Sequence, residues 1–395
     1  MACSILSLPV EIGEQVIQNI DSTADLYALS LSCKAFMESA RERIFANITF
    51  TLPFPNPLSG SVSSQETRLH ELSKMVAQTK YIKFISICAK PVTEPSEIVF
   101  PPSMQSILAG WLPQMTRLEK LVIDDLELDD RLILAILDIT SQRPLSLQLR
   151  RCPFPDPLLQ IPSIPLQIPS LYIQNYFDSA FVDRPVDEYT ATERQSIAFA
   201  KRLMFGARFS ITTLKVDWNS PLSLTEMFGS IFLPSLRVFQ WDSLLYTDDQ
   251  LPIIMDGFLQ RHSTITSISL ARGQYGHIPF SFPSLTRTPP SLPNLQIAKT
   301  TSSLIRQLVS GRPVTNISLD CVRPSGFTVG VKALSHSTAS IIKASLNFSE
   351  GDDTWEYVIE SLAEATPFLQ DLDLTTASPA LNTDVCTNLC FPHIS

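Results

Sequence analysis

The sequence predicts an α/β fold in which a small N-terminal module of three helices precedes an irregular solenoid of parallel inner strands and outer helices. Three observations lead to this prediction. Apolar residues in the first fifty positions recur at helical intervals. The pattern apolar-x-x-apolar-x-apolar then recurs along most of the remaining chain. Between the two regions, residues 51–64 are rich in Pro, Ser and Gly, which is typical of a loop or linker.

The composition restricts the classes of partner. The 395 residues carry 30 basic and 39 acidic side chains, a net charge of −9, without a basic tract, so we expect no nucleic-acid partner. Seven scattered cysteines indicate a reducing compartment. The N-terminus lacks the features of a signal peptide, and no stretch is long enough to cross a bilayer. We therefore expect a soluble cytoplasmic or nuclear protein without a membrane partner.

Three helices are predicted in the first fifty residues. The apolar residues of the first lie four residues apart and form one face: Leu8, Ile12, Val16 and Ile20. Ser22 and Asp25 resemble a capping pair that starts the second helix. The third segment extends from Glu38 to Ile48. The inward positions of the second and third segments are Leu26, Leu29, Cys33, Ala40, Ile44 and Phe45.

This run resembles the F-box. The matching segments, in order, are Leu8-Pro9, Glu11-Ile12, Val16-Ile17, Ile20, Asp25-Leu26, Leu29, Ser32 to Phe36, and Ile44-Phe45 with Ile48. The sequence departs from the family at Phe36, where many members have Trp, and at Gly13, which weakens a helix by roughly 1 kcal/mol relative to Ala. The resemblance implies that residues 1–50 dock on the Skp adaptor of a cullin ligase. The implied contact residues are Leu8, Pro9, Ile12, Ile17, Ile20, Leu26, Leu29 and Phe36.

The recurring strand pattern starts at eleven positions, most of them 22 to 29 residues apart: Ile82, Leu118, Pro144, Ile168, Ile211, Leu236, Ile265, Leu292, Val314, Ile341 and Leu369. Helices are predicted between copies at DDRLILAILDIT, DDQLPIIMDGFLQRH, SSLIRQLVSG and DTWEYVIESLAEAT. Thr190 and Glu193 are spaced as a capping box before a further helix. We expect residues 51–78 to be a linker and connecting helix, and residues 79–395 to be the repeat domain.

A strand and a helix repeated at this period resemble leucine-rich repeats, whose units stack their strands into a parallel sheet with the helices outside. Regular members have Asn or Cys eight residues after the first apolar position, where it hydrogen-bonds the turn. Here Cys152 and Asn219 alone occupy that position, so we expect the turns to be held differently. The alternative is an unrelated α/β domain, whose buried parallel strands are also apolar. Doubly wound folds, however, lack a strand motif that recurs at so short a period.

No local motif of a common enzyme class is present, such as a phosphate-binding loop, a zinc-protease helix or a nucleophile elbow. The five histidines lack ligand-spaced neighbours. Four acidic pairs resemble metal ligands: Asp124-Asp125, Asp129-Asp130, Asp248-Asp249 and Asp352-Asp353. Three of them precede predicted helices, where capping accounts for them. We expect no enzyme activity, metal or cofactor; the alternative is an enzyme whose site is assembled from residues distant in sequence.

In a solenoid the polar positions of each strand face a concave surface, and the apolar positions face the core. The predicted substrate-binding residues on that surface are Arg150, Tyr172, Lys215, Asp217, Trp218, Gln240, Asp242 and Arg272. Tryptophan is enriched in binding hot spots. Trp241 falls on an inward position and is assigned to the core, whereas Trp218 fits the core and the rim equally.

The leading hypothesis is a substrate receptor of an SCF-type ubiquitin ligase, with the Skp adaptor bound by the N-terminal helices and an unknown protein held by the repeats. Such a receptor acts by proximity, without a catalytic residue of its own. The alternative is a repeat-protein scaffold whose first three helices only cap the solenoid and have no ligase role.

Overall fold

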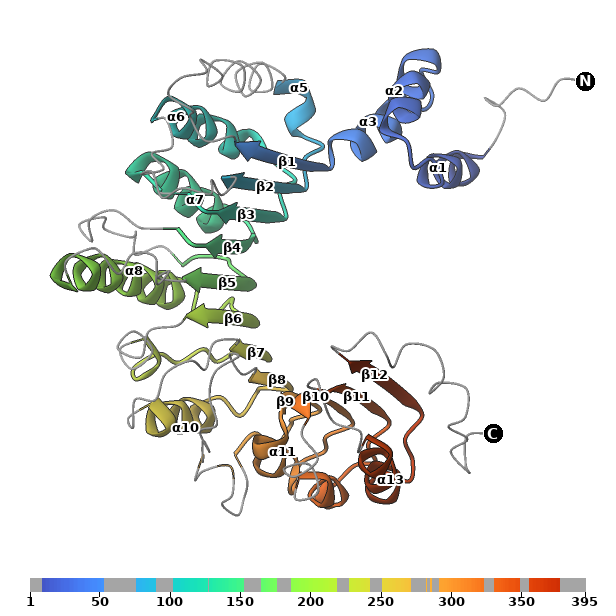
Figure 1. The fold of residues 1–395 in the computed structure, drawn as a ribbon. Helices are drawn as coiled ribbons and strands as arrows, with labels where there is room; N and C mark the ends of the chain where they lie inside the picture. Colours follow the sequence, from blue (N-terminus) through green and yellow to red (C-terminus); the bar gives the residue numbers. More distant parts are fainter. Residues whose placement is uncertain are drawn as a thin grey trace, which may run out of the picture. The chain divides into compact units, whose positions relative to one another are not determined.

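The computed structural model describes residues 9–52, 76–89, 102–126, 128–152, 165–175, 186–218, 227–241, 251–270, 282, 285, 291–322, 330–348 and 355–376. The chain divides into two compact units, Met1–Ile168 and Pro169–Ser395, and each is described by itself (Figure 1). The first contains α1 (Val10–Gln18), α2 (Thr23–Ser32), α3 (Met37–Phe45), β1 (Asn47–Leu52), α5 (Val76–Thr79), β2 (Phe84–Ala89), α6 (Pro102–Trp111), η2 (Leu112–Gln114), β3 (Lys120–Asp124), α7 (Asp130–Gln142) and β4 (Ser146–Arg150). The second contains β5 (Ser170–Asn175), α8 (Val186–Gly206), β6 (Thr213–Trp218), β7 (Val238–Trp241), α10 (Leu251–Arg261), β8 (Ser267–Leu270), β9 (Ile297–Thr301), α11 (Ser302–Val309), β10 (Asn316–Val322), η5 (Leu334–His336), β11 (Lys343–Phe348), α13 (Trp355–Ala365) and β12 (Asp371–Thr376).

The N-terminal module, α1 to α3, folds around a small apolar core. Ile17, Leu26 and Phe36 are buried together at its centre. Ser22 caps α2 as predicted, because its Oγ accepts a hydrogen bond of 3.2 Å from the backbone N–H of Asp25. The partly buried side chains around this core are Ile20, Leu29, Cys33 and Ile44. Ala40 of α3 is buried as well, but the buried side chains remain few, so the module relies on close packing at each of them.

Gly13 of α1 packs directly against the ring of Phe36. A Cβ atom on Gly13 would lie 2.8 Å from Cε1 of Phe36, closer than two carbon atoms approach without repulsion. The missing side chain therefore allows the Phe36 ring to pack directly on the backbone of α1. The lower helix propensity of glycine is offset by this contact in the module core.

Helix α3 leads almost directly into the first strand of the sheet. The sequence analysis extended the third helical segment to Ile48, but α3 ends at Phe45 and β1 begins at Asn47. Burial alternates along β1, with Thr49 exposed and Phe50 buried, as expected for a strand with one covered face. The repeat pattern did not predict this strand, because it lies before the linker and apart from the other copies of the pattern.

The strands of the first unit, β1 to β4, are parallel and lie side by side in chain order. Their register aligns Ile85, Leu121 and Leu147 in one fully buried row. The adjacent row of core residues is Ile87, Ile123 and Leu149. The predicted pattern positions are therefore in register, and α6 and α7 pack on the same side of these strands (Figure 1).

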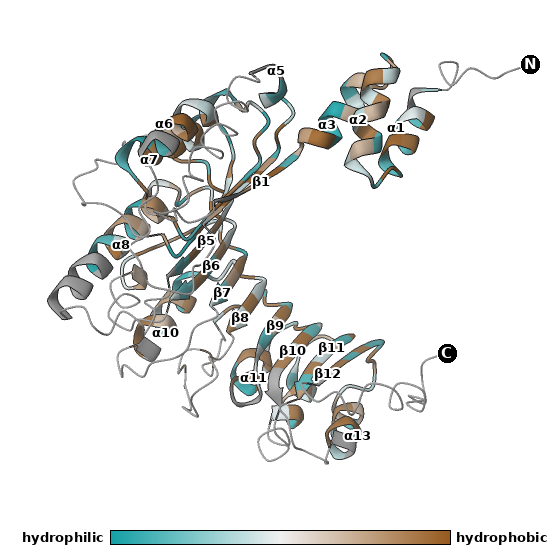
Figure 2. Cartoon of the chain, turned by 45° about the horizontal axis from the view of Figure 1, so that its top comes forward, coloured by the Kyte–Doolittle hydropathy of each residue, from teal (hydrophilic) through white to brown (hydrophobic). Residues whose placement is uncertain are grey.

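The strands of the second unit, β5 to β12, are also parallel and in chain order. Hydrophobic and hydrophilic residues alternate along them (Figure 2), which agrees with one face in the core and one facing outward. One predicted start was wrong. The pattern at Leu292 placed Ile297 inward, but Ile297 pairs in register with Ser267 and is exposed. Ala298 faces the core instead, so this repeat begins three residues later, at Leu295.

The helices predicted between strand copies are confirmed as α7, α10, α11 and α13. Helix α7 begins as expected, because Asp129 Oδ1 accepts a 2.8 Å hydrogen bond from the N–H of Leu132. The capping box at Thr190 was a wrong assignment, since α8 already begins at Val186 and Thr190 lies inside it. None of the described helices is long and apolar enough to span a membrane.

Cys152 occupies the turn position expected of a leucine-rich repeat. Its Sγ donates to the carbonyl of Arg150 at 3.2 Å and lies 3.5 Å from the carbonyl of Ile123 in the preceding strand. Burial raises the pKa of this thiol to about 12, so it stays protonated and able to donate. Asn219, the other candidate for this role, lies outside the described residues.

Elsewhere buried polar side chains of other types connect the turns. His262 Nε2 accepts a 2.8 Å hydrogen bond from the N–H of Leu233 in the preceding repeat, while Nδ1 lies 2.6 Å from the carbonyl of Phe258. Burial lowers the pKa of His262 to about 4, so the ring is neutral with its proton on Nδ1. The guanidinium of fully buried Arg312 donates to four carbonyl groups, those of Leu285, Ser291, Gln307 and Ser310. The chain is thus an irregular leucine-rich-repeat fold whose turns are held by varied residues.

Candidate ligand-binding surfaces

Two pairs of large apolar side chains on the N-terminal module are exposed to solvent. Ile12 and Val16 lie one turn apart on α1, and Tyr27 and Leu31 lie one turn apart on α2. Leu31 is the most exposed of the four, at 67 %. Exposed apolar side chains clustered on so small a module are typical of a surface that a partner covers. We call these four residues the α1–α2 apolar surface.

The eight residues predicted to contact the adaptor have different positions in this module. Three form its core and two pack half-buried around it: Ile17, Leu26, Phe36, Ile20 and Leu29. Pro9 and Ile12 are exposed, and Leu8 lies outside the described residues. The buried residues hold the helices in place, so of the predicted set Pro9 and Ile12 are the exposed members that a partner could touch. The helical spacing of Tyr27 and Leu31, opposite the Leu26 side of α2, was the signal in the sequence for the rest of the surface.

Helix α3 attaches the module to the first repeats. Glu38 accepts a hydrogen bond from the hydroxyl of Tyr81, which lowers the pKa of the Glu38 carboxyl. One turn later, Glu42 pairs with Lys83 at 2.9 Å and with Arg117 at 3.0 Å. The hydrogen bond from Lys83 lowers the pKa of Glu42. Helix α3 therefore faces the repeats, whereas the α1–α2 apolar surface belongs to the other two helices.

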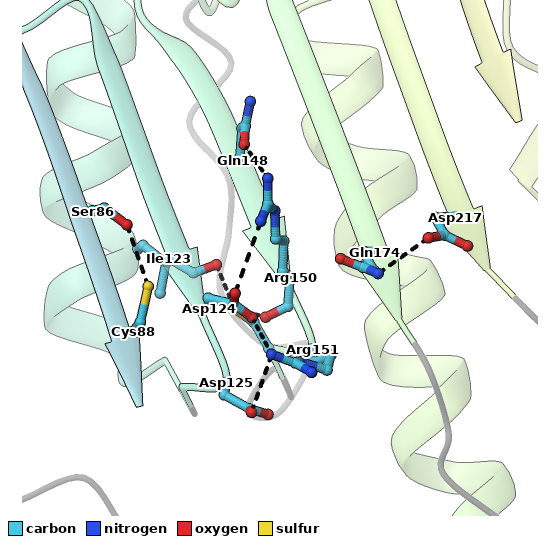
Figure 3. A network of polar contacts seen from close by, with 11 residues as sticks. Ser86, Cys88, Ile123, Asp124, Asp125, Gln148, Arg150, Arg151, Gln174 and Asp217 are labelled. Atoms are coloured by element: carbon cyan, nitrogen blue, oxygen red, sulfur yellow. Dashed lines mark hydrogen bonds and ion pairs between the residues drawn. The ribbon is translucent and has the colours of Figure 1, made fainter. Parts of the chain in front are cut away.

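A charged cluster lies at the C-terminal ends of β3 and β4 (Figure 3). Asp124 Oδ1 accepts a 2.8 Å hydrogen bond from Arg151, and its Oδ2 lies 3.9 Å from the guanidinium of Arg150. Arg151 also lies 3.3 Å from a carboxylate oxygen of Asp125, and Arg150 donates to Gln148 Oε1 at 2.9 Å. Asp124 is largely shielded from water, so two arginines balance its charge on the open face of the sheet.

The backbone of this cluster is constrained. Asp125 and Arg151, at equivalent positions after β3 and β4, have left-handed φ angles of 60° and 50°. Residues other than glycine adopt this region at a cost of about 1–3 kcal/mol when the surroundings enforce it. The N–H of Asp125 donates to the carbonyl of Arg150 at 2.9 Å, which links the two turns. Burial raises the pKa of Asp125, and the charge of Arg151 opposes that shift. The cluster is consequently a fixed polar surface.

The open face beside this cluster is polar. Cys88, Asp124 and Arg150 share one register row across β2, β3 and β4. Ser86 Oγ and Cys88 Sγ lie 3.3 Å apart, in hydrogen-bond contact (Figure 3). Among the described residues, two apolar side chains lie on this face: Val122 is buried between polar neighbours, and the ring of Phe84 lies 5.4 Å from Lys120 Nζ. The face therefore offers hydrogen-bond groups and charges of both signs to a polar partner.

The second unit also presents a polar open face. Lys215 Nζ lies 4.6 Å from the centre of the Tyr172 ring, a cation–π contact between β6 and β5. Gln174 Nε2 donates to Asp217 Oδ2 at 3.1 Å (Figure 3). Gln240 follows Lys215 in the same register row. The predicted face residues Tyr172, Lys215, Asp217 and Gln240 are thus neighbours on one surface.

The remaining predicted face residues lie elsewhere. Trp218 is fully buried, so it packs in the core at the end of β6 and is removed from the face. Trp241 is buried as well, as its inward position predicted. Asp242 and Arg272 lie outside the described residues. The sequence does not distinguish core from rim for Trp218, because a residue at the end of a strand follows the same alternation in either position.

Among the described residues, no group of three or more His, Cys, Asp or Glu side chains is arranged to hold a metal ion. Asp129 is a helix cap, and Asp124 and Asp125 pair with arginines. The pairs at 248–249 and 352–353 lie outside the described residues. His262 has a structural role in a turn.

Comparison with known proteins finds no match among the protein-family models and none among the curated proteins. Solved structures do match. One is a chain of the crystal structure of the Rad7 and Elc1 complex in yeast, 13 % identical, with 96 % of this chain and 92 % of that chain covered and a TM-score of 0.43. Another is the leucine-rich-repeat-containing protein LegL7 from Legionella pneumophila, 13 % identical, with 85 % and 87 % covered and a TM-score of 0.35. Both likenesses are distant, so the description of the fold rests on its strand register and helices.

Proposed function

We propose that this chain is the substrate-recognition subunit of an SCF-type ubiquitin ligase, in which α1 to α3 form an F-box that binds a Skp adaptor. The observation that carries the proposal is the α1–α2 apolar surface. A monomeric module gains nothing from four exposed large apolar side chains, but a module that docks on a partner buries them. The ordered resemblance of residues 8–48 to the F-box indicates which partner this is.

The attachment of α3 supports the same proposal. The ion pairs of Glu42 with Lys83 and Arg117 use the side of the module that faces the first repeats. The adaptor would then cover α1 and α2 without competing with the repeats. Because the connection from α3 to β1 is short, docking of the module would also fix the position of β1. Fixed geometry matters for a receptor that acts by holding its substrate near a charged ubiquitin-carrying enzyme.

The open faces of the repeats are the proposed site for a protein substrate. They carry arginine, lysine, tyrosine and aspartate side chains held by mutual contacts, which lowers the entropy lost on binding. The mixed charges favour a substrate segment that is itself polar and of both signs. The substrate itself is unknown, and the chain acts by proximity in this proposal, with no reaction step of its own.

Direct binding to a purified Skp adaptor tests the proposal. We expect the double variant Ile12→Asp/Tyr27→Asp to bind the adaptor at least tenfold more weakly than wild type, because charges replace buried apolar contacts. Leu134→Asp is the matched control, since Leu134 is exposed on α7, away from the module. Circular dichroism shows whether each variant stays folded. Unchanged adaptor binding by the folded double variant would contradict the proposal.

A second function, a repeat-protein scaffold without a ligase role, is favoured by one observation. Glu38 and Glu42 join α3 to the first repeats in the way that a capping helix closes the end of a solenoid. In that case the full-length protein binds no Skp adaptor at micromolar concentration. The adaptor titration described above therefore distinguishes the two functions.

A further inference from the structure

The turns at the N-terminal ends of β6 and β7 carry an exposed group of aromatic and basic side chains. Phe205 and Phe209 are 62 % and 64 % exposed at the end of α8 and in the turn that follows it. Phe232 is 53 % exposed in the corresponding turn of the next repeat. Exposed phenylalanines of this size are costly in water. Three of them in two adjacent turns therefore call for an explanation.

Arg208 organises this group. Its guanidinium lies 4.6 Å from the ring centres of both Phe205 and Phe209, so one cation contacts two aromatic rings. No carboxylate of the described residues pairs with Arg208. Through these contacts the arginine holds the two rings in place. We call Phe205, Arg208, Phe209 and Phe232 the aromatic–arginine patch.

The backbone beneath the patch is firmly held. Ala207 and Ile211 are fully buried on either side of Phe209, and the N–H of Ile211 donates to the carbonyl of Ala207 at 3.1 Å. The carbonyl of Phe209 accepts a 2.9 Å hydrogen bond from Ser235 Oγ, which connects this turn to the next one. On that next turn the Phe232 ring lies 5.5 Å from the ring of His262. The aromatic side chains therefore project from a rigid base, which suits preformed recognition.

The local charge is opposite to that of the whole protein. Segments 194–216 and 227–241 contain no Asp or Glu. Their basic residues nearest the patch in sequence are Lys201, Arg202, Arg208 and Arg237, whereas Lys215 lies on the open face of the sheet. The whole chain has a net charge of −9. A local excess of positive charge attracts a short acidic segment, whereas the net negative charge of the whole protein disfavours an extended polyanion such as a nucleic acid or an anionic membrane.

We propose that the aromatic–arginine patch binds an acidic peptide segment of a partner protein, one that carries an aromatic or large aliphatic side chain between its carboxylates. The carboxylates pair with Arg208 and neighbouring basic side chains, and the apolar side chain covers Phe209 and Phe232. Arginine and aromatic residues, phenylalanine included, are enriched in protein interfaces. This surface is separate from the open face of the sheet, and the inference holds whether or not the chain serves a ligase.

Fluorescence anisotropy with the full-length protein tests this proposal. The probe is a labelled twelve-residue peptide in which glutamates alternate with phenylalanines, and the comparison peptide has lysine in place of each glutamate. We expect the acidic peptide to bind at least tenfold more tightly than the basic one, with affinity that falls as salt is raised. Equal binding of the two peptides would overturn the proposal.

Variants locate the site. Arg208→Glu and Phe209→Ser should each weaken the acidic peptide at least fivefold, whereas Ile253→Ser, at an exposed apolar position on α10, should leave it unchanged. Circular dichroism confirms folding of each variant. An equal loss in Ile253→Ser would contradict the assignment. Tight binding of a labelled oligothymidine or of phosphatidylserine vesicles that Arg208→Glu abolishes would instead assign the patch to a nucleic acid or a membrane, and would overturn it.

Discussion

The helices of the N-terminal module and the strands of the repeats place apolar side chains differently. The module buries three residues in its core and exposes four large ones on α1 and α2. The repeats bury two apolar residues in almost every strand and present polar side chains on the open face of the sheet. A repeat completes its core with its neighbours, whereas the module keeps an exposed apolar surface. In the proposed function, this difference separates the docking element from the recognition element.

The two regions also differ in the unusual residues on which their packing depends. In the module, one glycine makes room for one aromatic ring. In the repeats, buried His262 and Arg312 hydrogen-bond backbone groups of the turns, as a repeated Asn does in regular leucine-rich repeats. The module should therefore be sensitive to added volume, and the repeats to lost hydrogen bonds. The following changes probe that contrast.

Arg312→Met should have the largest effect. It removes the donors to four carbonyl groups, one buried and three partly buried, and a buried group costs about 1–3 kcal/mol when left unsatisfied, so the second unit should lose on the order of 3 kcal/mol. Chemical denaturation followed by circular dichroism measures this loss. Arg306→Met, on the exposed side of α11, is the control and should change stability little. A loss below about 1 kcal/mol in Arg312→Met would show that the carbonyls find other partners.

Acidification should weaken the repeats through His262. The pKa of its ring is about 4 in the fold against 6.5 in the unfolded chain, so between these values the unfolded chain binds a proton that the folded one does not. Unfolding free energy should therefore fall as pH drops from 6.5 to 4, by up to about 1.4 kcal/mol per unit, and this contribution is fully present above pH 6.5. Denaturation at several pH values measures the slope. The slope should be smaller in His262→Gln, and an identical slope would remove His262 as its cause.

Gly13→Ala should destabilise the module by about 1 kcal/mol, although alanine favours helices. Crowding of the Phe36 ring costs about 1–3 kcal/mol, which exceeds the gain of about 1 kcal/mol in helix propensity. Gly110→Ala on α6 is the matched control, because a Cβ there meets no atom within 4 Å. The combination of Gly13→Ala with Phe36→Leu should recover stability relative to Gly13→Ala alone. Thermal denaturation would contradict this account if Gly13→Ala were as stabilising as Gly110→Ala.

Changes at Arg151 should have the smallest effect. Arg151→Gly relieves the left-handed backbone but loses the ion pairs with Asp124 and Asp125, so the two terms nearly cancel and stability should stay within about 0.5 kcal/mol of wild type. Arg151→Ala loses the ion pairs and keeps the strain. It should therefore be less stable than Arg151→Gly in denaturant titrations. The reverse order would mean that the turn is not strained.

Much of this architecture could be predicted from sequence, because the strand pattern records burial directly. Ten of the eleven predicted strand starts agree with the observed register or burial, and the displaced one, at Leu292, arose because the turn residues there imitate the pattern. Strand β1 was missed because it holds a single copy of the pattern before the linker.

The surfaces were harder to predict, because they depend on packing between segments. Ile17 and Phe36 belong to an apolar stripe, but only the packing of three helices decides which members of that stripe are buried. Trp218 follows the alternation of its strand to the end, where core and rim have the same pattern. The contact of Gly13 with Phe36 joins residues far apart in sequence and leaves no local signal.

The central claim is that α1 and α2 form a surface completed by an adaptor. Hydrogen–deuterium exchange of the full-length protein, with and without a purified Skp adaptor, tests it most directly. We expect the amides of Val10–Gln18 and Thr23–Ser32 to exchange at least tenfold more slowly in the presence of the adaptor, while those of α7 are unchanged. Unchanged exchange in α1 and α2 at saturating adaptor, or protection confined to the strands, would contradict the claim.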